Sequence, residues 1–244
     1  GKGLGNQFLT DLNEADVLIH VVDFTGETDL EGEPTDDHDP RDDIDFLETE
    51  LDMWYLDILK KGIERHRSGY DGTERDIEAD LAEQMSAFGI SEEELKQVCL
   101  GLGLELDPDT WAATDRETLA REIRIRTKPM IIAANKADTE AAQQNYAEIT
   151  SDPAYGHLTI VPVSAHAEKA LKNGHEADVL EYRPGDDDFE VTGELPEAKR
   201  NGLERIGDFL DEFGGTGVQR AIETALFEEL GAVAVFPGAR KPQD

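Results

Sequence analysis

The chain has 244 residues, with 56 Asp and Glu against 23 Lys and Arg, and its formal charge is −33. Such a field repels nucleic-acid phosphates and anionic membranes, and no apolar run approaches the roughly 18 residues of a membrane span, so neither partner is expected. The single cysteine, Cys99, allows no internal disulfide, which indicates a reducing cytoplasm. We expect a cytoplasmic monomer with a sizeable core, in one large domain or two small ones.

The acidic residues are spread along the whole chain and are not confined to a tail. This distribution is typical of proteins from cells that accumulate salt, because molar salt shortens the Debye length to about 3 Å and screens self-repulsion. The sequence therefore favours a halophilic protein, and an acidic protein from an ordinary cell is the alternative.

Three short runs have the character of buried parallel strands, because they are apolar throughout and do not alternate. These runs cover residues 17–22, 130–134 and 158–163. A helix with Phe8, Leu9 and Leu12 facing inward is expected before the first run. A polar loop follows each run, and helical sequence follows the second and third, so the order predicts an α/β fold with a parallel sheet.

A long insertion, residues 24–127, separates the first two strands and is expected to be helical after an acidic loop. Helices are expected over residues 44–59, 76–88 and 116–125, with a further one after a capping box of Ser91 and Glu94. The densest basic stretch of the chain lies at its end and comprises Arg121, Arg124, Arg126 and Lys128. The apolar stripe of the first helix is expected to pack internally, and an arm that docks on a protein, or on RNA through its arginines, is the alternative.

The C-terminal part mixes short elements. An acidic loop or small hairpin is expected over residues 182–193, followed by a helix over 203–213 that the glycine pair 214–215 stops. Thr216 is expected to cap a last helix. Residues 232–236 have the composition of a strand.

The strongest chemical signal is Asn135-Lys136-Ala137-Asp138, directly after the second predicted strand. Loops at the carboxyl ends of parallel strands bind ligands in α/β domains. The Asp138 carboxylate can accept two parallel hydrogen bonds from the ring N–H and the exocyclic amine of guanine, whereas adenine offers no such donor pair. Asn135 can tie neighbouring loops together, and the stem of Lys136 can lie against the purine face. A polar turn is the alternative.

Ser164-Ala165-His166 follows the third predicted strand. A small residue here lets a backbone N–H approach the guanine carbonyl, Ser164 can orient the loop, and His166 is expected to serve loop structure and not catalysis. Two such loops, in this order and each at a strand end, predict a guanine pocket formed by Asn135, Lys136, Asp138, Ser164, Ala165 and His166.

These two motifs resemble the fourth and fifth guanine-recognition elements of P-loop GTPases. Residues 1–9 and 15–23 resemble the stretch after switch II in the Obg/YchF-type branch, and the insertion is similar to that of archaeal YchF-type proteins. Residues 215–237 resemble the approach to the family's C-terminal TGS domain. The resemblance implies a Rossmann-like P-loop GTPase sheet, GTP or GDP as ligand, and a link to the ribosome or a translation factor. Because many YchF-type members prefer ATP, ATP stays open as the ligand.

No G-x-x-x-x-G-K-[ST] phosphate loop occurs in the sequence. The resemblance therefore implies the back part of a GTPase domain, divided into residues 1–23, the insertion 24–127, residues 128–236 and a tail 237–244 towards a missing TGS domain. Mg²⁺ is implied for the parent protein with its ligands outside this chain, and no catalytic or metal-binding residue is assigned here. A non-catalytic interaction module is the alternative function.

Other polar residues have plainer interpretations. His20 lies in the first strand and is expected to be a core histidine with hydrogen-bond partners. Asp23 is expected to cap a loop and not to bind a metal, and Cys99 is expected to be inert. The acidic runs 36–37 and 186–188 are expected to be solvated surface.

Overall fold

The computed structural model describes Leu12, residues 14–68 and residues 77–235. Its centre is a sheet of three strands, β1 Leu18–Asp23, β2 Met130–Asn135 and β3 Thr159–Pro162. The order is β1-β2-β3 and both pairs are parallel, with Leu18 opposite Met130 and Ile131 opposite Thr159. The predicted α/β class with a parallel sheet is confirmed.

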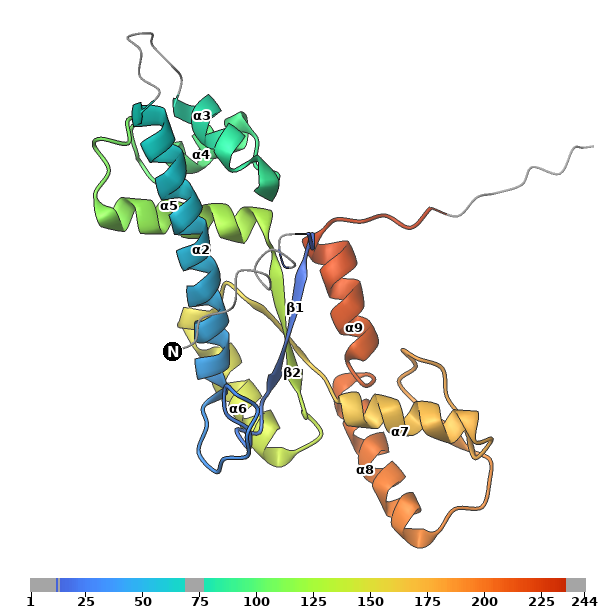
Figure 1. Cartoon of the computed structure of the whole chain (residues 1–244). Coiled ribbons are helices and arrows are strands. Elements are labelled where there is room, and N and C mark those ends of the chain that lie inside the picture. Colours follow the sequence, from blue (N-terminus) through green and yellow to red (C-terminus); the bar gives the residue numbers. More distant parts are fainter. Residues whose placement is uncertain (1–11, 13, 69–76, 236–244) are drawn as a thin grey trace, which may run out of the picture.

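Helices form most of the remainder (Figure 1). The helices of the first half are α2 Pro40–Ser68, α3 Ile77–Gln84, the short 3₁₀ turn η1 Ser86–Phe88, α4 Glu92–Gly101 and α5 Ala113–Thr127. Those of the second half are α6 Glu140–Ser151, the 3₁₀ turn η2 Pro153–Tyr155, α7 Ala165–Glu176, α8 Glu197–Phe213, α9 Val218–Glu223 and the π-helical turn η3 Thr224–Glu229. No helix in this described part combines the length and apolar character that a membrane crossing requires.

Helices cover the two faces of the sheet unequally. On one face, α2 and α6 pack against alternate strand residues such as Val22 and Ile132. On the other face, α9 and η3 pack against β2 and β3 but leave β1 uncovered, so Ile19 and Val21 are 40% and 60% exposed. The first predicted run, which forms β1, is therefore buried on one face only. Its burial on the other face would require α9 and η3, which lie far along the chain, to extend over β1.

The long helix α2 belongs to two cores. Its first half buries Ile44 and Leu51 against the sheet, and its second half buries Tyr55 and Leu59 against α3, α4 and α5. We call α3, α4, α5 and this second half of α2 the helical arm, which extends away from the sheet in Figure 1. The apolar stripe is thus internal packing, as predicted. The predicted capping box of Ser91 is present at the start of α4.

The basic stretch at the end of the arm is partly internal. Arg124 is 2% exposed, and it donates from Nε to Asp52 and from Nη2 to Glu48, each at 2.8 Å. Burial acts to lower the pKa of Arg124, but these hydrogen bonds and charges outweigh it and raise that pKa. Lys128 is also buried, and it donates to the carbonyl of Ala15. Arg124 is therefore not available to RNA, unlike the exposed Arg121.

The C-terminal part confirms two predictions. β4 Leu180–Glu181 pairs antiparallel with β5 Glu190–Val191, which makes the small hairpin. α8 ends at Gly214, whose φ of 69° lies in the left-handed region that glycine tolerates without a side-chain clash.

Three expectations are wrong or lie outside the described residues. Of the strand expected over residues 232–236, residues 232–235 form no strand and are exposed, because no neighbouring strand offers them hydrogen bonds in the described part, and Phe236 lies outside the described residues. Thr216 does not cap α9, since Gly217 occupies the N-cap and the Thr216 hydroxyl donates to Glu168. The helix expected before β1 falls mostly outside the described residues, although Leu12 is described and packs against the core.

Candidate functional site

The loop after β2 has a fixed backbone. Lys136 adopts a φ of 63°, a left-handed conformation that is uncommon for a residue with a side chain. Thr139 holds this turn, because its hydroxyl donates to the Lys136 carbonyl at 2.9 Å and also accepts the N–H of Ala142 at the start of α6. The turn that carries Asp138 is thereby set by hydrogen bonds on both sides.

The loops after β2 and β3 are joined to each other. The Oδ1 atom of Asn135 accepts the N–H of Ala165 at 3.1 Å, and the N–H of Ala137 donates to the Val163 carbonyl at 3.1 Å. The structure therefore places Asn135 where it ties the two loops. Since the Ala165 N–H is engaged, the backbone N–H of His166 is the loop's donor without a partner among the described residues.

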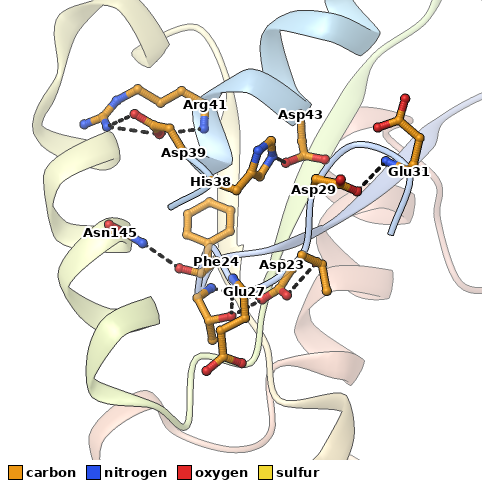
Figure 2. A network of polar contacts seen from close by, with 12 residues as sticks. Asp23, Phe24, Glu27, Asp29, Glu31, His38, Asp39, Arg41, Asp43 and Asn145 are labelled. Carbon is orange, nitrogen blue, oxygen red and sulfur yellow. Dashed lines mark hydrogen bonds and ion pairs between the residues drawn. The ribbon is translucent and has the colours of Figure 1, made fainter. Parts of the chain in front are cut away.

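Lys136 contacts the end of β1 (Figure 2 shows Asp23 and its loop). Its Nζ donates to Asp23 Oδ2 at 2.8 Å and lies 3.7 Å from Glu27. Asp23 also accepts from the N–H and hydroxyl of Thr25 and the hydroxyl of Thr28. Partial burial acts to raise the pKa of Asp23, but these four hydrogen bonds outweigh it and lower that pKa to about 2. Asp23 caps its loop, as predicted, and also holds Lys136.

The loop that follows Asp23 is anchored from several elements (Figure 2). Phe24 is fully buried, its N–H donates to the Asn135 carbonyl at 3.2 Å, and its carbonyl accepts from Asn145 of α6 at 2.8 Å. His38 and Asp43 form a hydrogen bond of 2.5 Å where this loop enters α2. These contacts fix the position of Asp23 relative to the loop after β2.

Ser164 is the buried support of the second loop. It is fully buried, caps α7 and accepts the N–H of Ala167 at 3.0 Å. Ala165 and His166, one and two residues further on, are exposed. The groups that could contact a ligand therefore stand on a buried, hydrogen-bonded base.

A pocket of about 660 Å³ opens beside these loops, between α7 and α8. Asp138 and His166 line it, whereas Asn135, Lys136, Ser164 and Ala165 do not. Sequence analysis did not single out four other polar lining residues, which are Thr139, Asn173, Lys199 and Arg205. Their signal was weak, because a single threonine or asparagine and two cations on a helix are ordinary in any sequence.

Sequence analysis also missed a buried polar cluster below the second loop. Glu168 accepts the hydroxyls of Tyr182 and Thr216, each at 2.7 Å. Burial, together with hydrogen bonding to the Glu168 carboxylate, raises the pKa of Tyr182 to about 12. A buried glutamate in the first turn of α7 is the one signal that could have indicated this cluster.

His20 differs from its prediction. Its Nδ1 atom is buried and has no hydrogen-bond partner in the described structure. Burial, opposed by the charges of Asp43 and Glu48, lowers the pKa of His20. The ring is held by packing on the α2 face of β1, and its hydrogen bonding is not satisfied as expected. Cys99 is buried, in accord with an inert side chain.

Residues 133–239 match the family model for the G4 motif-containing domain of YGR210-like Obg-like GTPases. The chain carries an Obg-like GTPase G4 domain. The loops after β2 and β3 both lie inside the matched residues, while β1 and the helical arm precede them.

Two relatives extend the similarity over nearly the whole length of this chain. An uncharacterized GTP-binding protein of Methanocaldococcus jannaschii is 38% identical over 97% of this chain and 59% of its own. An uncharacterized GTP-binding protein of Schizosaccharomyces pombe is 29% identical with the same coverage. The crystal structure of a GTP-binding protein from Pyrococcus horikoshii OT3 has a TM-score of 0.72 at 38% identity and covers 91% of this chain and 60% of that one.

A shorter match links the chain to another named protein. The ribosome-binding ATPase YchF of Escherichia coli O157:H7 is 38% identical over 82 residues, which are 34% of this chain and 22% of that protein. The chain spans 59% of the length of the two longer curated relatives. It therefore corresponds to part of their length.

Proposed function

We propose that this chain recognises the base of a guanine nucleotide and contributes this recognition to a GTP-binding protein. The observation that carries the proposal is the 3.1 Å hydrogen bond between Asn135 and the Ala165 N–H, which joins two loops at neighbouring strand ends. Asp138 and His166 then line one pocket. The names of the archaeal and yeast relatives, which are GTP-binding proteins, support the proposal.

The chemistry of the exposed groups fits guanine. The Asp138 carboxylate is exposed and can accept the ring N–H and the exocyclic amine, at roughly 1.5–3 kcal/mol for each charge-assisted hydrogen bond. The base carbonyl would face the N-terminus of α7, where the His166 N–H and the positive end of the helix dipole favour an acceptor. The Lys136 stem, held by Asp23, would lie along the purine face.

For a protein of the relatives' full length we propose GTP hydrolysis and association with the ribosome. The name of the YchF relatives supports the ribosome link. These 244 residues contain no phosphate loop, so the proposal assigns them neither phosphate nor Mg²⁺ contacts. Deletion of residues 25–126 is expected to abolish co-sedimentation of the full-length protein with ribosomes if the helical arm docks there, and unchanged co-sedimentation would remove the arm from that role.

Two alternatives rest on specific observations. The YchF relatives are named ATPases, which favours an adenine nucleotide. The missing phosphate loop favours a non-catalytic interaction module. Both alternatives assign a different role to the loops after β2 and β3 from the one that the guanine proposal gives them.

A nucleotide titration of the 244-residue chain distinguishes the guanine proposal from its two alternatives. The ligands are GTP, GDP and ATP, and binding is followed by the amide NMR shifts of residues 135–139 and 164–167. The guanine proposal expects shifts with GTP and GDP that Asp138→Asn weakens about tenfold or more, and Glu140→Gln serves as the matched control on an exposed neighbouring carboxylate. Equal affinity for ATP, unaffected by Asp138→Asn, would instead support an ATP-preferring site. No shift with any nucleotide would support the interaction module.

A further inference from the structure

The turn between α8 and α9, residues 214–217, contacts the second base-recognition loop directly. The N–H of Ser164 donates to the carbonyl of Thr216 at 2.9 Å. Thr216 is 1% exposed and Ser164 is fully buried, so this hydrogen bond is shielded from water. The turn therefore supplies a backbone acceptor to the residue that caps α7.

A second contact joins the side chain of the same turn to α7. The Thr216 hydroxyl and the Tyr182 hydroxyl both donate to Oε2 of Glu168, each at 2.7 Å. Tyr182 is 3% exposed and Glu168 is 9% exposed. Because a buried carboxylate without donors is costly, removing one donor is expected to move α7 or admit water.

A third contact fixes how closely the turn approaches the sheet. Gly217 has a φ of 79°, and a Cβ atom built there would overlap the carbonyl oxygen of Pro162 at the end of β3. A side chain at this position would both strain the backbone and displace the turn. The turn therefore sits against the strand end from which the second loop emerges.

We propose that Thr216 and Glu168 are positioning residues that set the amides at the start of α7, so that base selectivity depends on the turn between α8 and α9. This proposal rests on the proposed function for its effect on nucleotides. Neither residue lines the pocket beside Asp138 and His166. They act through Ser164 and through the first turn of α7, which carries the N–H of His166.

The test compares Thr216→Val, which keeps the shape and removes the hydroxyl, with Thr216→Ser, which restores it. The matched control is Thr159→Val, because Thr159 also donates to a carboxylate, Glu229, at 2.9 Å and also ties β3 to the C-terminal helices, but at the other end of the strand. Amide hydrogen exchange of Ser164 and Ala165, whose N–H groups are hydrogen-bonded, is measured by NMR in the nucleotide-free 244-residue chain. The ratio of GTP to ATP affinity is measured alongside.

Thr216→Val is expected to accelerate exchange at the hydrogen-bonded amides of Ser164 and Ala165 about tenfold and to lower the ratio of GTP to ATP affinity about five- to tenfold, as expected for the loss of one buried hydrogen bond. Thr216→Ser and Thr159→Val are expected to leave both measurements near wild type. Unchanged exchange in Thr216→Val, or equal acceleration in Thr159→Val, overturns the proposal. If wild type does not prefer GTP while Thr216→Val still accelerates exchange locally, the proposed function fails and the positioning role stands.

Discussion

Charged side chains lie in opposite environments in the helical arm and in the loops at the carboxyl-terminal edge of the sheet. Where α5 of the arm meets the first half of α2, Arg124 is 2% exposed and bonded to Asp52 and Glu48. At the sheet edge, Asp138 is exposed and has no partner among the described residues, while Ser164 nearby is buried and bonded. A charge that stabilises the fold is buried with its partners, and a charge that is available to a ligand stands exposed on a buried support.

The comparison would break if the buried charge could be removed without loss of stability. Arg124→Met leaves Glu48 and Asp52 without their shared cation, and we expect a loss of about 3–5 kcal/mol in the free energy of unfolding. Urea unfolding at constant salt measures it. Arg126→Met, at an exposed position two residues away, is the control and is expected to change stability by about 0.5 kcal/mol or less. Equal losses in both variants would contradict the assignment.

The opposite outcome is expected for the exposed charge. Asp138→Asn should leave the free energy of unfolding within about 0.5 kcal/mol but weaken GTP binding by about 2–3 kcal/mol, because one charge-assisted acceptor is lost and an amide donor faces the base amine. The same variant should gain affinity for the xanthine nucleotide, whose carbonyl replaces that amine. Calorimetry with GTP and XTP measures both, and a variant that loses stability and binding together would show that Asp138 is structural.

Asp23 lies between the two cases, because it is mostly buried but pairs with the partly exposed Lys136. The pKa of Asp23 in the folded protein is about 2, below the ordinary 3.8. The contribution of Asp23 to the free energy of unfolding is therefore fully present above about pH 4 and is lost as the pH falls towards 2. Asp23→Asn is expected to cost about 1–2 kcal/mol at pH 7, discounted for the exposure of Lys136.

The check for Asp23 is the difference in unfolding free energy between wild type and Asp23→Asn as a function of pH. That difference should narrow between pH 4 and 2, and a difference that is constant over this range would contradict the pairing. The differential measurement is needed because the chain has 56 acidic residues, whose common titration appears in both proteins.

The smallest effect is expected at a local feature of the arm. Ser91→Ala removes the hydroxyl that accepts the Glu94 N–H in the capping box of α4 and should cost about 1 kcal/mol. Ser151→Ala is the control, because Ser151 lies exposed at the end of α6 and caps no helix start. Thermal or urea unfolding measures the stability of the two variants. Equal stability of Ser91→Ala and Ser151→Ala would mean that packing alone fixes the start of α4.

The features that sequence analysis predicted correctly depend on neighbours along the chain. The apolar runs of β2 and β3, the capping box at Ser91 and the stop at Gly214 are each set within a few residues. The polar loops that begin at Asn135 and Ser164 follow strands for the same reason. The Obg-like family assignment of residues 133–239 agrees with motifs that are contiguous in the sequence.

The features that were missed depend on contacts across the chain. Lys136 and Asp23 are 113 residues apart, and Thr216 meets Glu168 across 48 residues. A threonine before a helix is a reasonable cap on local grounds, but here a buried carboxylate takes its hydroxyl instead. Similarly, Arg124 resembles a surface cation until α2 brings Asp52 and Glu48 against it.

The sequence by itself determined the class of fold, the positions of the polar loops after β2 and β3 and the acidity of the chain. Hydrophobic periodicity, turn residues and composition are properties of the chain itself. The tertiary structure alone decided which polar groups are buried with hydrogen-bond partners and which are exposed to solvent. Hydrogen-bond partners of buried groups come from elements distant in the chain, and their energy depends on exclusion of water. Asp138 is exposed and Arg124 is buried for this reason, although both are charged residues.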